Sequence, residues 1–277
     1  MRHYLLPVLL LAVTVLEASA QRYLEEPARI EGEGPYVTSY TTLDGKYMRS
    51  YSYRYDSERH VSLWVAYPLN SALIGSGSRG EGWQPDPSIS ESVQPVLYKG
   101  FRYGSGYDRG HQIPSADRLD PEANRQTFLF TNATPQLHDF NGGIWAELEK
   151  VVRTWAKRSD TLYVVTGIIP GESVINDNAG KSVNIPAAYY KTILRRHTDK
   201  KGTVRWSACA ILLPHENLQV GTWQQNLSFF REHSLSLVEL EKLTGERYYP
   251  LLATILDEVS EKRIREASPS ETTWWWR

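Results

Sequence analysis

Alternating apolar and polar positions along the chain predict two β-hairpins and a buried strand. Residues 47–55 and 60–69 are rich in aromatic and β-branched side chains and flank a short polar turn, which is the pattern of a hairpin. Residues 161–169 form a mostly apolar run that predicts a buried strand. Residues 189–197 and 203–213 predict a second hairpin, because the segment between them is polar and ends in glycine.

A helical pattern follows Asn141. Apolar residues recur there at steps of three and four, which places them on one face of an amphipathic helix; they are Ile144, Trp145, Leu148, Val151, Val152 and Trp155. Glu149 and Arg153 lie four residues apart at the border of this face. Taken alone, they predict an ordinary surface ion pair. Strands combined with a helix of this kind predict a domain of the α+β class.

The first 20 residues have the pattern of a secretory signal peptide. A basic start is followed by an apolar run from Leu5 to Val15 and by small residues that end at Ala20. We therefore predict cleavage between Ala20 and Gln21 and a secreted or periplasmic protein with no stable membrane association. The apolar run is short for a spanning helix, and an uncleaved anchor is the alternative.

Cysteine content bears on how a secreted domain is stabilised. Cys209 is the single cysteine and lies in the apolar run 208–213, which predicts a buried thiol. One cysteine cannot form an internal disulfide, so the stability of the domain depends on packing. The length of 277 residues and the hydrophobic content of 41% suffice for one domain with a sizeable core.

The segment DRGHQIPSADR, residues 108–118, sets a candidate general base beside fixed positive charge. His111 is the residue type that exchanges protons near neutral pH, and Arg109 carries the planar cation best suited to a phosphate. The next motif, TNATPQ, contains Asn132. The motif NGGIWAELE then supplies the amide of Asn141 and the carboxylate of Glu149. Such oxygen donors suit Mg²⁺, which keeps most of its bound waters in proteins.

In this order, the motifs DRGH, TNxTPQ, NGGxW and LE make the chain resemble the DNA/RNA non-specific endonuclease family. That family includes secreted bacterial nucleases and mitochondrial endonuclease G. The motifs that carry the chemistry span residues 79–153, and weaker similarity continues through 236–245. The resemblance implies the ββα-metal, or His-Me finger, fold: an α+β domain with a central antiparallel sheet flanked by helices.

The resemblance also implies a set of site residues. His111 would be the general base that activates water, Asn141 the direct ligand of the metal, and Glu149 the carboxylate that holds metal-bound waters. Asn132 would organise the site. Three arginines would bind substrate phosphate and act in catalysis, and these are Arg79, Arg109 and Arg153. Arg79, in the segment SRGEGW, is assigned by its place ahead of the motifs, within a loop of variable length.

On this basis the chain divides into four segments. These are a signal peptide over residues 1–20, an N-terminal lead over 21–42, a non-specific endonuclease domain over 43–266 and a C-terminal tail over 267–277. The tail ends in three consecutive tryptophans. We weigh three states for them, which are a frayed terminus, docking on the domain and stacking on bases.

Net charge argues only weakly against nucleic-acid binding. The chain has 31 basic and 32 acidic residues and a formal net charge of −1, whereas tight non-specific binders are usually basic. An enzyme needs positive charge only near the bound phosphate. Six basic residues lie between Lys191 and Arg205, against the single acidic residue Asp199. They predict either a hairpin tip that contacts the nucleic-acid backbone or a solvated turn.

The activity that the resemblance implies is hydrolysis of DNA and RNA, giving 5′-phosphate and 3′-hydroxyl ends. The cofactor would be Mg²⁺, with Mn²⁺ or another divalent cation as the alternative. Contacts to phosphate and sugar carry no sequence information, so low specificity is expected. Two other functions stay open: a non-catalytic nucleic-acid-binding protein and a phosphodiesterase for small esters. The sequence leaves open whether the chain forms a homodimer or binds a protein inhibitor.

Overall fold

The computed structural model describes residues 23–43, 45–97, 106–272 and 274–276. The predicted signal peptide lies outside the described residues. Within them, no helix combines the length and the hydrophobicity needed to cross a bilayer.

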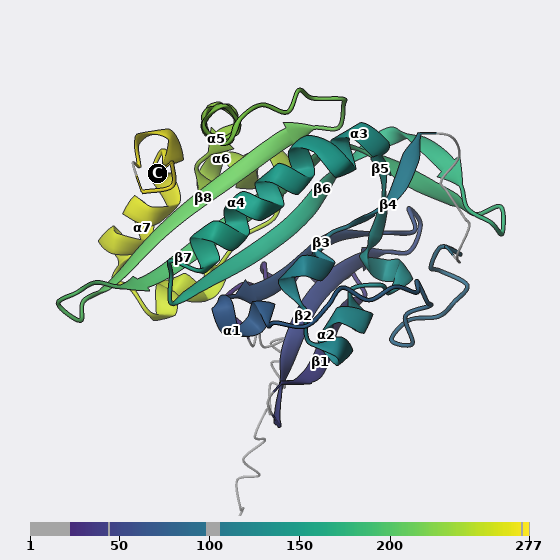
Figure 1. Cartoon of the computed structure of the whole chain (residues 1–277), viewed down its shortest axis with the longest axis horizontal. Helices are drawn as coiled ribbons and strands as arrows, with labels where there is room; N and C mark the ends of the chain where they lie inside the picture. The colour runs from purple at the N-terminus through teal and green to yellow at the C-terminus, as the bar shows by residue number, and fades with distance from the viewer. Residues whose placement is uncertain (1–22, 44, 98–105, 273, 277) are drawn as a thin grey trace, which may run out of the picture.

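A seven-stranded sheet forms the centre of the domain, in the order β1-β2-β3-β6-β7-β8-β9 (Figure 1). All neighbouring strands are antiparallel. The strands are β1 (Tyr36–Leu43), β2 (Lys46–Asp56), β3 (Val61–Leu69), β6 (Thr161–Asn176), β7 (Ser182–Thr198), β8 (Val204–Pro214) and β9 (Ser234–Leu235). The predicted α+β class with a central antiparallel sheet flanked by helices is confirmed.

Both predicted hairpins are confirmed, as β2–β3 and β7–β8. The predicted buried strand is β6, which runs seven residues past its expected end at Ile169. Strand β1 was not predicted, and its residues fall almost entirely in the segment that the sequence assigned to the lead. It pairs with β2 from Tyr36 opposite Arg54 to Leu43 opposite Lys46. As an edge strand it has a single buried side chain, Thr41, so its sequence lacks apolar alternation.

The helices are α1 (Ser71–Ile74), α2 (Pro121–Gln126), α3 (His138–Phe140), α4 (Ala146–Ala156), α5 (Trp223–Glu232), α6 (Leu237–Thr244) and α7 (Glu258–Glu266). The longest helices of the described residues are α4, with 11 residues, and α5, with 10. Single turns are η1 (Ser115–Asp117), η2 (Phe130–Asn132), η4 (Pro250–Thr254) and η5 (Pro269–Glu271), and the π-helical segment η3 (Asn141–Trp145) leads into α4.

Successive residues of the long strands enter two different cores. Tyr189 of β7 packs with α4 in one core, which we call the α4 face. The next residue, Tyr190, packs with α6, η4 and α7 in the other core, the α6 face. Cys209 on β8 belongs to the α4 face and is fully buried, as predicted. This two-residue alternation fixes which strand side chains can approach α4.

Strands β4 (Tyr107–His111) and β5 (Ala133–Leu137) form a separate two-stranded antiparallel sheet that leads through α3 and η3 into α4. This is the ββα arrangement expected from the motifs. His111 closes the pairing, opposite Ala133. A Cβ at the neighbouring Gly110 would lie 2.1 Å from the Gln136 side chain, so a larger residue there would displace Gln136. The predicted helix after Asn141 forms, with a kink at Gly143.

The tryptophan tail docks on the domain. Trp275 is fully buried, and its ring lies 4.8 Å from that of Trp155 near the end of α4. Trp274 lies under the guanidinium of Arg195, with 3.4 Å between the guanidinium carbon and the ring centroid. The frayed terminus is therefore wrong. Burial also leaves Trp275 no free face for stacking on a base.

The basic segment from Lys191 to Arg205 does not form one cationic surface. Lys191 points into the α4 face and is fully buried. Arg195 donates to the Ser159 hydroxyl, and Arg196 pairs with Asp160 at 2.7 Å. The predicted alternatives, a tip that contacts the nucleic-acid backbone and a solvated turn, therefore concern the three exposed basic residues at the tip, Lys200, Lys201 and Arg205.

Candidate active site

His111 stands at the end of β4 against two aromatic rings that also contact each other. Its ring centroid lies 4.7 Å from that of Trp83 and 4.9 Å from that of Phe128. Burial, together with the charges of Arg79 and Arg109, lowers the pKa of His111 to about 3. The imidazole is therefore neutral at physiological pH. Its Nε2 is buried and has no hydrogen-bond partner within the described part of the chain.

Asn132 fixes the loop that follows His111. Its Oδ1 accepts from the backbone N–H of Ile113 at 2.9 Å. Its Nδ2 donates to the carbonyls of Ile113 at 3.0 Å and of Thr127 at 2.8 Å. The side chain is buried, and all three bonds are to backbone groups. The organising role that the resemblance implies is compatible with these contacts.

Arg79 and Arg109 line one cavity beside His111. The cavity measures about 570 Å³ and is also lined by Trp83 and Phe128. The guanidinium carbon of Arg109 lies 5.5 Å from the Trp83 ring centroid, and that of Arg79 lies 5.9 Å from the Phe128 ring centroid. The structure therefore brings Arg79 and Arg109 close to His111. Trp83 was missed in the sequence, although it lies only four residues after Arg79.

Asn141 is oriented by a carboxylate. Its Nδ2 donates to Oδ2 of Asp108 at 3.0 Å, and the same oxygen lies 2.9 Å from Nδ1 of His138. Because the amide nitrogen donates to Asp108, the amide oxygen is the atom of Asn141 that is able to bind a cation. Asp108 opens the DRGH motif and was not assigned a function in the sequence. Its contact with Asn141 explains why an acidic residue suits that position.

Arg153 is held mainly by a carboxylate that the sequence did not single out. Its Nη1 lies 2.8 Å from Oδ1 of Asp117 and 3.9 Å from Oε2 of Glu149. Asp117 is buried and also accepts from the Tyr67 hydroxyl at 3.1 Å. The predicted pairing of Glu149 with Arg153 is thus present as the longer of two contacts. The geometry fixes the guanidinium beside Glu149.

Lys191 lies under α4 and completes this charge cluster. Its Nζ donates to the Thr166 hydroxyl at 2.6 Å and lies 5.0 Å from the Trp145 ring centroid. Burial raises the pKa of Glu149 to about 7, while Lys191 and Arg153 oppose that rise. Burial also lowers the pKa of Lys191 to about 8, against the charge of Glu149. The sequence carried a signal for the burial of Lys191. Side chains two positions apart on a strand point to the same face, and Tyr189 of β7 packs against α4.

The donor set fits a hard, water-rich cation. Within the described residues, no cluster of three or more histidine, cysteine, aspartate or glutamate side chains could enclose a metal ion. A site built from the Asn141 amide oxygen, with Glu149 reaching through water, meets the needs of Mg²⁺. Such a site is too poor in direct protein ligands for zinc.

The chain is similar to known nucleases in sequence and in fold. The family model described as DNA/RNA non-specific endonuclease matches residues 33–254. A nuclease of Nostoc sp. is 33% identical over 203 residues, covering 70% of this chain and 69% of that protein. A nuclease of Serratia marcescens is 31% identical over 149 residues, covering 52% of this chain and 56% of that protein.

A mitochondrial nuclease and a solved structure are also similar to this chain. The mitochondrial nuclease EXOG of Mus musculus is 30% identical over 210 residues; the match covers 72% of this chain and 55% of that protein. Several relatives thus extend well beyond the matched region. A chain of the solved EndoG/EndoGI complex has the same fold, with a TM-score of 0.57, 22% identity and coverage of 72% of this chain and 82% of that one. The family model and the Nostoc relative together show that this chain belongs to the DNA/RNA non-specific endonuclease family.

Proposed function

We propose that the chain is a secreted, divalent-metal-dependent endonuclease that hydrolyses DNA and RNA with little sequence specificity. The observation that carries the proposal is the position of a neutral His111. Its buried Nε2 lacks a partner among the described residues, and the ring lies beside the cavity that Arg79 and Arg109 line. A proton acceptor next to two fixed cations suits attack on a phosphodiester.

In this mechanism His111 takes a proton from the water that attacks phosphorus. A pKa of about 3 makes the imidazole a weak base in the free protein. The bound phosphate is an anion, so it offsets the lowering by Arg79 and Arg109 and strengthens the base when substrate is in place. The neutral form needed for proton transfer is already present before substrate binds.

The arginines would neutralise the charge that develops at phosphorus. Arg109 and Arg79 approach from the cavity beside His111, and Arg153 approaches from α4, where Asp117 holds it at 2.8 Å. A guanidinium fixed in advance needs no reorganisation during the reaction. Asn141 and Glu149 would hold the cation, which when bound polarises the phosphate and stabilises the leaving oxygen. The products expected from this attack are 5′-phosphate and 3′-hydroxyl ends.

Substrate range and location follow from weaker observations. Arginine contacts address phosphate, which DNA and RNA share, so both polymers should be cut. Secretion is supported by the signal-peptide pattern of residues 1–20.

The test is cleavage of closed circular DNA and of RNA by the purified protein, with Mg²⁺ or with chelator, beside His111→Ala. We expect metal-dependent degradation of both polymers that the variant loses. A chromogenic diester runs in parallel. Turnover of the diester with intact polymer would favour a small-ester phosphodiesterase. Polymer binding without cleavage at any metal would favour a non-catalytic binding protein, and either result would overturn the proposal.

A further inference from the structure

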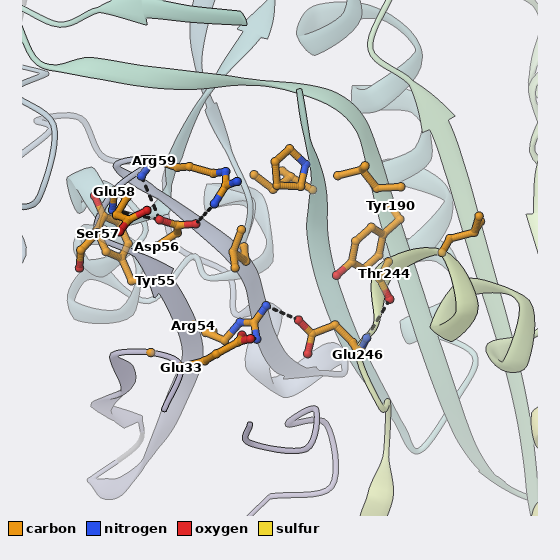
Figure 2. A pocket seen from close by; sticks show the side chains of 16 residues that line it. Glu33, Arg54, Tyr55, Asp56, Ser57, Glu58, Arg59, Tyr190, Thr244 and Glu246 are labelled. Atoms are coloured by element: carbon orange, nitrogen blue, oxygen red, sulfur yellow. Dashed lines mark hydrogen bonds and ion pairs between the residues drawn. The ribbon is translucent and has the colours of Figure 1, made fainter. Parts of the chain in front are cut away.

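Both arginines that line the cavity between the β2–β3 turn and the end of α6 are paired with carboxylates (Figure 2). Nη2 of Arg54 lies 2.6 Å from Oε1 of Glu246, and Nη1 of Arg59 lies 2.8 Å from Oδ2 of Asp56. An anionic ligand needs a cation that the protein has not already paired. The arginines of this cavity, which measures about 560 Å³, are therefore not available to a phosphate.

A different cavity, of about 450 Å³, lies between the β1–β2 hairpin and α2, and we call it the α2 cavity. Figure 1 shows α2 beside these strands. It is distinct from the cavity beside His111, which we call the catalytic cavity. Among the described residues that line the α2 cavity, Arg125 is the single basic residue, and it is exposed. Its guanidinium makes no ion pair or hydrogen bond within the described part of the chain. This cation is available to a ligand.

The carboxylate in the lining of the α2 cavity is shielded from such a ligand. Asp86 is 1% exposed, and its Oδ2 accepts from the hydroxyls of Tyr53 and Thr131, each at 2.6 Å. Its Oδ1 accepts from the backbone N–H of Ser88 at 2.8 Å. Both oxygens are thus occupied by donors that the protein supplies. The exposed charge of the lining is therefore that of Arg125.

An open aromatic face lines the same cavity. Tyr47 is 74% exposed, and no other aromatic side chain among the described residues is as exposed. Its ring lies nearly parallel to that of Tyr40, with 5.2 Å between the centroids and 11° between the planes. Nε2 of Gln126 donates to the Tyr40 carbonyl at 2.5 Å, which joins α2 to the strand. A ring that is stacked on one side and exposed on the other offers a flat surface to a further ring.

The α2 cavity and the catalytic cavity share a wall. The backbone N–H of Gln84 donates to the carbonyl of Phe128 at 3.0 Å, and the Gln84 carbonyl accepts from the N–H of Phe130 at 2.9 Å. Successive side chains on extended segments point to opposite sides. Trp83 and Phe128 line the catalytic cavity, whereas the next residues, Gln84 and Leu129, line the α2 cavity. The wall is one residue thick, so a polymer bound in the catalytic cavity can extend directly into the α2 cavity.

We propose that the α2 cavity binds a single-stranded stretch of the nucleic acid beside the cut, with a phosphate on Arg125 and an unpaired base on the open face of Tyr47. This inference rests on the proposed nuclease function and specifies where the strand continues beyond the catalytic cavity. A cation combined with an aromatic ring holds a single strand without reading its sequence. Bases within a duplex stack on one another, so the ring of Tyr47 selects unpaired bases.

The test is fluorescence anisotropy of labelled single strands with the purified protein in the presence of chelator, which keeps the strands uncut. The probes are a deoxythymidylate strand, a uridylate strand and an abasic deoxyribose strand of the same length. Tyr47→Ala should raise the Kd of the two base-bearing strands about fivefold or more and leave that of the abasic strand unchanged. Arg125→Ala should raise Kd for every strand and reduce the slope of log K against log salt by about 0.7, the value for one phosphate.

Arg263→Ala is the matched control, since it removes the same charge from an exposed position on α7. It should change neither Kd nor the salt slope. Tyr47 and Arg125 are both exposed, so their replacement should leave the melting temperature close to that of wild type.

Three results would each overturn the proposal. They are equal weakening of base-bearing and abasic strands by Tyr47→Ala, an unchanged salt slope in Arg125→Ala, and an equal dependence on Tyr47 when the probe is a duplex. Failure of the nuclease function appears separately, as the absence of metal-dependent cleavage by wild type. A wild type that cleaves, with both variants binding as it does, would refute only the role of the α2 cavity.

Discussion

Replacing His111 by glutamine should make the protein less sensitive to acid. The ordinary pKa of histidine is 6.5, and burial lowers that of His111 to about 3. In the unfolded chain His111 therefore takes up a proton below pH 6.5, whereas in the folded protein it stays neutral until about pH 3. The unfolding free energy linked to His111 is therefore highest above pH 6.5, and it decreases as the pH falls from 6.5 toward 3.

The size of the effect follows from the two pKa values. Between pH 8 and pH 5 the unfolded state gains nearly one proton at His111 and the folded state gains almost none. The linkage relation converts this difference into about 2 kcal/mol of lost unfolding free energy. Glutamine does not titrate, so the variant escapes that loss.

Urea unfolding of both proteins at pH 8 and pH 5 measures the effect. The wild type should lose about 2 kcal/mol more than His111→Gln between the two pH values. Any constant effect of the substitution cancels, because each protein is compared with itself. Equal losses in the two proteins would refute the reasoning, since they would mean that the ring of His111 takes up a proton as readily in the folded protein as in the unfolded chain.

Three further substitutions test other parts of the structure. Asn132→Ala leaves buried backbone groups of Ile113 and Thr127 without partners and should cost about 2–3 kcal/mol in urea unfolding; a loss near zero would contradict its anchoring of the loop. Trp275→Ala removes a fully buried ring and should lower the unfolding free energy by about 3–5 kcal/mol. Trp275→Phe should lower it less. Unchanged thermal unfolding of Trp275→Ala would show that the tail is not docked. Glu149→Gln should shift the Mg²⁺ titration of cleavage to about tenfold higher concentration, and an unchanged titration would remove Glu149 from the cation site.

The long strands and α4 could be predicted because each carries a strong periodic signal. Alternation over 47–69 and 189–213 marks strands with buried side chains, and the apolar face of α4 repeats at helical spacing. Strand β1 gave no such signal, since it lies at the sheet edge with one buried side chain. Its pairing with β2 is a tertiary effect that local pattern does not record.

Motif order supplied the catalytic candidates but not the residues that hold them. The contacts of Asp117 with Arg153 and of Asp108 with Asn141 join segments more than thirty residues apart. Lys191 resembled a surface lysine in a basic segment, although the alternation of β7 places it beneath α4. Long-range pairing of this kind depends on the sheet register, which one sequence does not give.

The most direct test of the account is the single-turnover cleavage rate of an end-labelled DNA duplex with Mg²⁺, for wild type and His111→Gln. A positioned general base contributes about 10²–10⁴-fold to rate, so the variant should be slower by that factor. Wild-type products should also be joined by a ligase that requires 5′-phosphate and 3′-hydroxyl ends. A variant rate within a few-fold of wild type would contradict the assignment of His111 as the base.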